Sequence, residues 1–258
     1  MILVNGIQRI GASVLQFLQE IGHHTFLFFK STASFRYALT HHRLVFDQMF
    51  KIGLRSFPLV TVVSIFTGAV TSWQAAYQLK GLVSMDYLGA AASMAILIEL
   101  SPVLTGLVVA GRVGASIAAE LGTMKVTEQI DALESLAIDP VQYLAVPRIT
   151  AGWTMLPVLV IYSNVVAHLG AFVVANALLD VSTGTFFSSV RRYFLVHNVY
   201  SGLIKALVFG WGTALIGCSI GFRTTGGAEG VGASTIKAFV YSSAFILVMD
   251  YVLATILF

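Results

Sequence analysis

Charged residues are absent from two long stretches of the chain. Residues 56–79 and residues 149–179 contain no Asp, Glu, Lys or Arg over 24 and 31 positions, respectively. A helix needs about 20 consecutive apolar residues to cross the hydrocarbon core of a bilayer, and ionised groups are costly there. We therefore predict that both stretches are transmembrane helices, the longer one tilted or extending beyond the membrane.

Three further stretches are long enough to cross a membrane if each tolerates one charge. They are residues 87–111 around Glu99, residues 199–222 around Lys205 and residues 238–258 around Asp250. Together with the first two stretches, they predict an all-α membrane protein with five spans in a single domain, residues 1–258.

The first 50 residues form a different kind of segment. Polar residues such as Arg9, Gln16 and Glu20 interrupt any apolar core of a span or a signal peptide. Apolar residues nevertheless recur at helical spacing, at Ile7, Ile10, Val14, Phe17, Leu18 and Ile21. This pattern predicts an amphipathic helix lying at the membrane surface; a helix packed against the spans is the alternative.

The most polar part of the chain is an insert, residues 112–148, between the second and third spans. Thr127 is placed to cap a short helix with Glu128 in its first turn, and the Asp139-Pro140 pair is placed to stop it. Glu128, Asp131 and Glu134 then form an acidic stripe, with Ile130 and Leu133 facing elsewhere. The helix is either a solvated connection or a docking element for a soluble partner.

The composition supports the membrane interpretation. Only 10% of residues are charged, against about 25% in ordinary globular proteins, and 57% are hydrophobic. The formal net charge is +3, but the 15 basic residues are scattered along the sequence and form no run of five or more, which argues against nucleic-acid binding. The single cysteine, Cys218, excludes an internal disulfide and a cysteine-based zinc site, and the pairs His23-His24 and His41-His42 lack metal-ligand spacing.

Basic residues predict the orientation, because Lys and Arg accumulate in cytoplasmic segments. With a cytoplasmic N-terminus, 11 lie inside: Arg9, Lys30, Arg36, Arg43, Lys51, Arg55, Arg112, Lys125, Arg148, Arg223 and Lys237. Three lie outside: Lys80, Arg191 and Arg192. We therefore expect a multi-pass protein with its N-terminus in the cytoplasm.

The three charges inside spans are candidate functional residues. Glu99, Lys205 and Asp250 should each face a cavity, the protein interior or a partner charge. Pro102 loosens the helix after Glu99 and exposes carbonyl groups, a combination found beside transport pathways. A structural ion pair between helices is an equal alternative, and Lys205 is near enough to a span end to reach the membrane surface.

The chain contains no motif that would make it an enzyme. The glycine-rich run at residues 226–232 lacks the Lys-Ser/Thr ending of a phosphate-binding loop and follows a span rather than a strand. We expect a turn there, with Glu229 free to contact the insert or a partner. Nucleophile and metalloprotease motifs are also absent from the sequence. A membrane subunit without its own nucleotide site fits these observations.

The chain resembles the MlaE-type permeases of lipid-trafficking ABC transporters over essentially its whole length. The matching residues are Glu99-Leu100-Ser101-Pro102, Gly111-Arg112-Val113-Gly114, Ala119-Glu120-Leu121-Gly122-Thr123-Met124, Thr127-Glu128-Gln129-Ile130-Asp131-Ala132-Leu133-Glu134, Asp139-Pro140, Pro147-Arg148, Lys205, Phe209-Gly210, Gly217-Cys218, the run 226–232 and Asp250. Ser101 replaces a glycine that is usual in the family, and Ser219 replaces a frequent aromatic residue.

The resemblance implies a homodimeric permease in a bacterial inner membrane, whose two copies enclose a phospholipid cavity. It implies a cytoplasmic ATPase partner that binds ATP and Mg, a periplasmic lipid-binding partner of the MCE class, and no cofactor in this chain. It makes the N-terminal segment an interfacial elbow helix and places Glu99 in the helix that lines the cavity. The coupling helix that meets the ATPase then contains Glu128, Asp131, Leu133 and Glu134, with Arg112 and Glu229 in cytoplasmic loops.

Two other classes of function remain as alternatives from the residues alone. In an ion-coupled secondary transporter, Glu99 and Asp250 would carry protons, although such proteins commonly contain an internal repeat, and the chain shows none. In an intramembrane enzyme acting on lipids, the histidine pairs would serve as bases.

Overall fold

The computed structural model describes residues 22, 25, 27 and 29–258, and the described part of the chain is helical without strands. The predicted amphipathic helix, whose apolar positions fall in residues 7–21, lies outside the described residues. Among the described residues, five helical stretches are long and apolar enough to cross a membrane, which confirms the predicted number of spans: His42–Leu79, Met85–Val126, Val141–Leu178, Val196–Phe222 and Gly227–Leu257.

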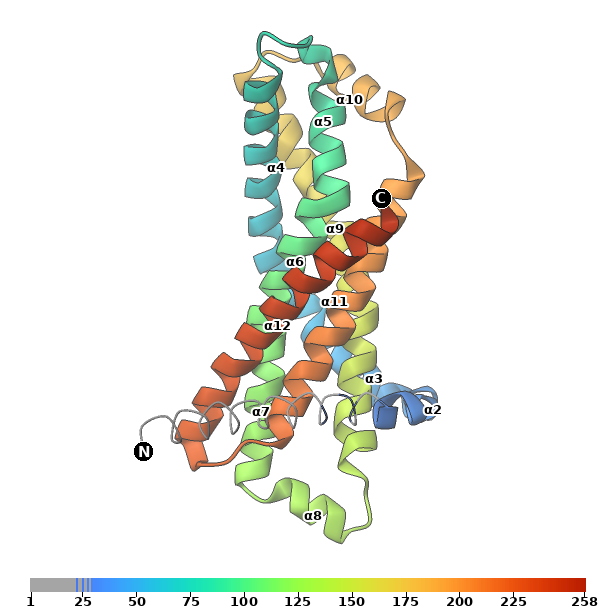
Figure 1. Cartoon of the computed structure of the whole chain (residues 1–258), viewed down its shortest axis with the longest axis vertical. Helices are drawn as coiled ribbons and strands as arrows, with labels where there is room; N and C mark the ends of the chain where they lie inside the picture. Colours follow the sequence, from blue (N-terminus) through green and yellow to red (C-terminus); the bar gives the residue numbers. More distant parts are fainter. Residues whose placement is uncertain (1–21, 23–24, 26, 28) are drawn as a thin grey trace, which may run out of the picture.

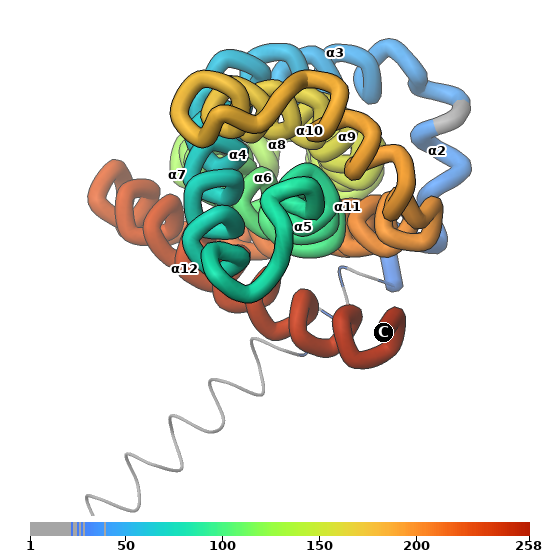
Figure 2. The backbone as a smooth tube through the Cα atoms, turned by 90° about the horizontal axis from the view of Figure 1, so that it is seen from above, coloured from blue at the N-terminus to red at the C-terminus, as the bar shows by residue number. Residues whose placement is uncertain are grey.

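The first described helices lie across the bundle rather than along it. Figure 2 shows α2 (Phe35–Thr40) and α3 (His42–Ile52) at one side of the bundle, seen from above. A short 3-10 turn, Leu54–Ser56, then leads into α4 (Phe57–Leu79), the first helix to run along the bundle axis. Pro58 in the first turn of α4 is compatible with this start, since the first turn needs no backbone N–H donor.

The second span is longer than the sequence predicted. The short 3-10 turn Met85–Tyr87 and the helices α5 (Leu88–Ala95), α6 (Ser101–Val109) and α7 (Ala115–Val126) form one continuous helical stretch of 42 residues. Two five-residue π-helical segments, Ile96–Leu100 and Ala110–Gly114, join its three parts. The helix therefore does not end at Gly111, because the apolar stripe at Ile117 and Leu121 stays buried in the bundle.

The remaining helices complete the bundle. They are α8 (Gln129–Ser135), α9 (Val146–Leu178) after a π-helical segment at Val141–Ala145, α10 (Thr183–Arg192), α11 (Val196–Phe222) and α12 (Gly227–Leu257). Figure 1 shows α8 at one end of the molecule, α10 at the other, and α12 crossing the bundle obliquely. The sequence analysis predicted no helix in the region of α10.

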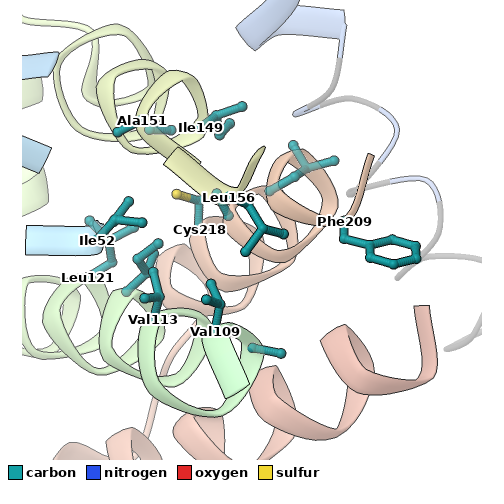
Figure 3. Packing of buried hydrophobic residues seen from close by; sticks show 14 of the residues in the cluster. Ile52, Val109, Val113, Leu121, Ile149, Ala151, Leu156, Phe209 and Cys218 are labelled. Atoms are coloured by element: carbon teal, nitrogen blue, oxygen red, sulfur yellow. The ribbon is translucent and has the colours of Figure 1, made fainter. Parts of the chain in front are cut away.

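The spans pack closely around one main core. Figure 3 shows Ile52 of α3, Val109, Val113 and Leu121 of the second span, Leu156 of α9 and Cys218 of α11 converging there. The helices α4 and α9 approach each other at Gly68 and Gly170, where an added Cβ atom would collide with the backbone of the other helix. Small residues at such crossings are typical of helices in membranes, where van der Waals contact drives association.

Candidate functional site

Three charged side chains meet inside the bundle and form what we call the charge cluster: Glu99, Lys205 and Asp250. The Nζ atom of Lys205 lies 2.6 Å from Oε2 of Glu99 and 2.7 Å from Oδ1 of Asp250. The three residues come from three different spans, the second, fourth and fifth. The only charges within the predicted core of the spans thus neutralise one another in part, as desolvated charges must.

The members of the charge cluster differ in their exposure. The side chain of Lys205 is fully buried, that of Asp250 is 14% exposed and that of Glu99 is 45% exposed. Lys205 therefore does not reach the membrane surface, which corrects the alternative that it extends from the span end. With two carboxylates and one ammonium, the ionised cluster carries a net charge of −1. Glu99 is its accessible member and can accept hydrogen bonds from a polar ligand.

The backbone around Glu99 is specialised. Glu99 lies in the π-helical segment Ile96–Leu100, and such segments are rare and concentrated at functional sites. Pro102 follows in the first turn of α6, is buried, and packs at Gly202 of α11. A Cβ atom at Gly202 would lie 2.5 Å from the Leu97 carbonyl oxygen and 3.2 Å from Cγ of Pro102. This close approach brings α11 near enough for Lys205 to reach Glu99.

Ser101 connects three helices beside the charge cluster. Its hydroxyl oxygen lies 2.7 Å from that of Ser163 in α9, and the Ser64 hydroxyl of α4 donates to Ser163 over 2.8 Å. Ser101 therefore braces α6 against α9 through a buried hydroxyl chain. Ser219, the other departure from the family pattern, is buried in α11.

A second polar contact inside the membrane was missed by the sequence analysis. His168 of α9 lies with Nε2 2.8 Å from the Ser93 hydroxyl of α5 and Nδ1 2.7 Å from the Asn164 carbonyl oxygen. The sequence analysis counted His168 as uncharged, so it did not interrupt the charge-free stretch 149–179. No spacing pattern distinguishes this histidine either.

The predicted coupling element is a short helix that projects from the bundle. In α8, Ile130 is buried and Leu133 is partly buried against the main core, whereas Asp131 and Glu134 are exposed. The predicted acidic stripe therefore faces outward. Lys125 of α7 forms an ion pair with Asp131, with Nζ 2.6 Å from Oδ1, which connects the stripe to the end of the second span.

The ends of α8 differ from the prediction. Thr127 does not cap α8: its hydroxyl bonds to the Thr123 carbonyl over 2.8 Å and closes α7. Glu128 is the N-cap instead, in a left-handed conformation with φ of 59°. At the other end, Ala137 has φ of 58° and the Ile138 amide donates to the Leu133 carbonyl over 3.0 Å, a Schellman termination.

This termination changes the role of the Asp139-Pro140 pair. Because α8 has already ended, Asp139 does not stop it but accepts from the Val141 amide over 2.9 Å and so caps the next helical segment. Its carboxylate also pairs with Lys30, 2.9 Å away. After this turn, the apolar side chain of Leu136 is 70% exposed at the tip of the projecting segment. The sequence analysis predicted only acidic residues on the exposed face.

The two predicted loop residues lie in helices. Arg112 is in the π-helical segment Ala110–Gly114 and donates to the Ser56 hydroxyl over 2.6 Å. Glu229 is exposed in the first turn of α12, where the helix dipole favours an acid. The glycine run therefore begins α12 rather than forming only a turn, with positive φ at Gly226 and Gly227.

Comparisons with known proteins agree with this architecture. The family described as Permease MlaE matches residues 45–256. A probable ABC transporter permease protein of Rickettsia typhi is 36% identical over 256 residues, 99% of each chain. The intermembrane phospholipid transport system permease protein MlaE of Haemophilus influenzae is 30% identical, covering 99% of this chain and 98% of that one. TRIGALACTOSYLDIACYLGLYCEROL 1, chloroplastic, of Arabidopsis thaliana is 37% identical, covering 84% of this chain and 62% of that one.

Five spans around a buried charge cluster, together with relatives named as permeases, define a multi-pass membrane permease. The chain belongs to the MlaE permease family. The resemblance drawn from its motifs is thereby confirmed.

Proposed function

We propose that the chain is the membrane subunit of an ABC transporter that moves phospholipids between the inner membrane and the outer envelope of a bacterial cell. The observation that carries the proposal is the half-exposed Glu99 in a charge cluster whose Lys205 is fully buried. A partly exposed carboxylate at membrane depth needs a polar partner, and a lipid headgroup supplies one. The relative from Haemophilus influenzae is named for phospholipid transport, which supports this substrate class.

A second copy of the chain completes the lipid cavity in this proposal. The helix α12 buries only Ala238, Ser242 and Ile246 within one copy, although it contributes Asp250 to the charge cluster. Exposed aromatic residues such as Tyr251 lie along its remaining surface. Pairing of two copies near α12 would cover Glu99 and enclose the space in front of it, with Pro102 and Lys205 behind.

The chain itself contains no nucleotide-binding motif, so the energy must come from a partner. We place a cytoplasmic ATPase, which holds ATP and Mg, against α8, where Glu128, Asp131 and Glu134 face outward. Leu133 anchors α8 to the main core, so a displacement of α8 is transmitted to the bundle. The Lys125–Asp131 ion pair continues this connection into α7.

The opposite end of the bundle, at α10, then faces the periplasm and a lipid-binding partner of the MCE class. This orientation rests on the excess of Lys and Arg in the segments at the α8 end and places the N-terminus in the cytoplasm. The protein lies in the inner membrane in this arrangement.

The decisive experiment is purification of the tagged chain from its native membrane, followed by identification of the copurified proteins and lipids. We expect an ATPase, an MCE-class protein, two copies of the permease and bound phospholipid. The purified assembly, reconstituted into liposomes, should move labelled phospholipid only when ATP and Mg are supplied. Movement that follows an ion gradient without any ATPase would overturn the proposal in favour of the ion-coupled alternative.

A further inference from the structure

A polar groove lies beside the C-terminal half of α3, away from the charge cluster. Two adjoining hollows, of about 130 and 420 Å³, share the row Gln48, Lys51 and Arg55. Residues of the second span, among them Arg112, line the other side of the smaller hollow. The larger extends toward the start of α9. We call the two hollows together the α3 groove, and define it by the residues Gln48, Lys51, Arg55 and Arg112.

The α3 groove holds more positive charge than its acids neutralise. Lys51 and Arg55 are exposed, and neither forms an ion pair among the residues that the structure describes. Arg55 lies close enough to Arg112 for their like charges to interact unfavourably. Arg112 donates to a neutral group, the Ser56 hydroxyl. Lys51, Arg55 and Arg112 thus line one hollow, and no carboxylate of the described part of the chain is bonded to any of them.

Two acidic residues line the hollows but leave this excess in place. Glu120 is already occupied, because its Oε2 lies 3.0 Å from Nη2 of Arg148. Asp47 is the single remaining carboxylate of the lining, so one negative charge faces the three positive charges of Lys51, Arg55 and Arg112. An anion bound in the α3 groove would relieve the repulsion between the two guanidinium groups, and guanidinium groups bind phosphate oxygens with bidentate geometry.

Exposed apolar side chains next to the α3 groove distinguish a lipid from a soluble anion. Phe46, Phe50 and Leu54 are more than half exposed on and just after α3. The helix lies across the bundle at the point where the chain enters α4 (Figure 2). Aromatic residues at membrane depth beside unpaired cations are the combination by which interfacial helices hold anionic lipids.

We propose that the α3 groove binds the phosphate headgroup of an anionic lipid in the leaflet at the α8 end of the bundle. Lys51, Arg55 and Arg112 contact the phosphate, and Phe46, Phe50 and Leu54 lie against the acyl chains. The bound lipid holds α3 at the membrane surface beside the first residues of α4. This site is separate from the charge cluster and does not depend on which substrate the permease moves.

The test measures binding of short-chain lipids to the purified full-length protein in detergent. The probes are dihexanoyl phosphatidylglycerol, dihexanoyl phosphatidylcholine and inorganic phosphate, which differ in charge and in acyl chains. The test variant is K51Q/R55Q. The matched control is R36Q/R43Q, which removes the same charge from exposed positions in α2 and α3 outside the hollows.

We expect phosphatidylglycerol to bind the unaltered protein more tightly than either other probe. In K51Q/R55Q its affinity should fall about tenfold or more, because each basic residue near the surface contributes to anionic lipid binding. The R36Q/R43Q variant should bind as the unaltered protein does. Retained thermal stability of K51Q/R55Q in phosphatidylcholine would show that the loss is not unfolding.

Three results would overturn the proposal. Equal binding of phosphatidylglycerol and phosphatidylcholine would exclude charge recognition. Equal binding of inorganic phosphate would assign the α3 groove to a free anion rather than a lipid. An equal loss in R36Q/R43Q would reduce the effect to the overall surface charge.

Discussion

Lys205 and Asp250 form an ion pair between α11 and α12, with 2.7 Å between Nζ and Oδ1. Lys205 is fully buried and Asp250 nearly so, whereas Glu99, the second carboxylate at Lys205, is half-exposed. The two carboxylates therefore have different roles. Asp250 compensates the buried ammonium group and joins the fourth and fifth spans, and Glu99 is left available to a ligand.

The first prediction concerns the stability of the charge cluster. D250N should lower the thermal midpoint more than E99Q, because Asp250 is the more deeply buried partner. The double variant E99Q/D250N should lose more than the sum of both, about 3 to 5 kcal/mol, since it leaves Lys205 buried without a carboxylate. Thermal unfolding in one detergent measures this, with K205M/E99Q/D250N as the rescue control. Strictly additive losses would contradict the shared role of Lys205.

The second prediction separates transport from stability at Glu99. We expect E99Q to slow phospholipid transfer about tenfold or more while nearly preserving the thermal midpoint, because a hydrogen bond to a charged group contributes about 1.5 to 3 kcal/mol. Transfer of labelled lipid by the reconstituted assembly measures the effect, with S101A as a variant of the neighbouring hydroxyl chain. Normal transfer by E99Q, with only a stability loss in E99A, would make the residue structural.

The third prediction concerns α8. D131R/E134R should abolish lipid-stimulated ATP hydrolysis, because it reverses the charge of the exposed acidic stripe and also breaks the Lys125–Asp131 ion pair. The amount of permease in the membrane should stay the same. D86R at the other end of the bundle is the control, since Asp86 is also exposed. Unchanged stimulation in D131R/E134R would remove α8 from coupling.

The fourth prediction tests the strained end of α8. Ala137 adopts φ of 58°, a region that glycine occupies without steric cost. A137G should therefore stabilise the turn by about 0.5 to 1 kcal/mol after the added freedom of the unfolded chain is subtracted. A132G, in the interior of α8, should destabilise it by a similar amount. Hydrogen exchange of the α8 amides compares the stability of α8 in the two variants. A loss of protection in A137G would show that the backbone at Ala137 is not strained.

The fifth prediction concerns the approach of α11 to the second span. G202A should lower the thermal midpoint, because its Cβ atom would lie 2.5 Å from the Leu97 carbonyl oxygen and push α11 away from Glu99. In G232A of α12 the added methyl group meets nothing within 4 Å, and it should be neutral or mildly stabilising. Thermal unfolding of both variants measures this. An unchanged thermal midpoint in G202A would show that the close approach of the two helices does not contribute to stability.

Several features of the fold were predictable because their causes are local. Stretches of 24 and 31 residues without charge are visible in the sequence. Because ionised groups are costly in a bilayer, such stretches predict transmembrane spans. The outward acidic stripe of α8 follows from helical periodicity in the same way. Helix ends were less predictable, because Glu128 at the start of α8 and Ala137 after its end have a left-handed backbone, which neither residue type predicts.

By itself, the sequence determined that this chain is an all-α membrane protein with five spans, that three charges lie inside them, and that its motifs are those of the MlaE permeases. Only the tertiary structure decided that Glu99, Lys205 and Asp250 meet and that Glu99 is the half-exposed member of the three. It also decided that three cations without an ion pair among the described residues gather beside α3. The reason is physical: hydrophobicity and periodicity act between neighbours in the chain, whereas these contacts depend on the register and crossing of helices that are distant in sequence.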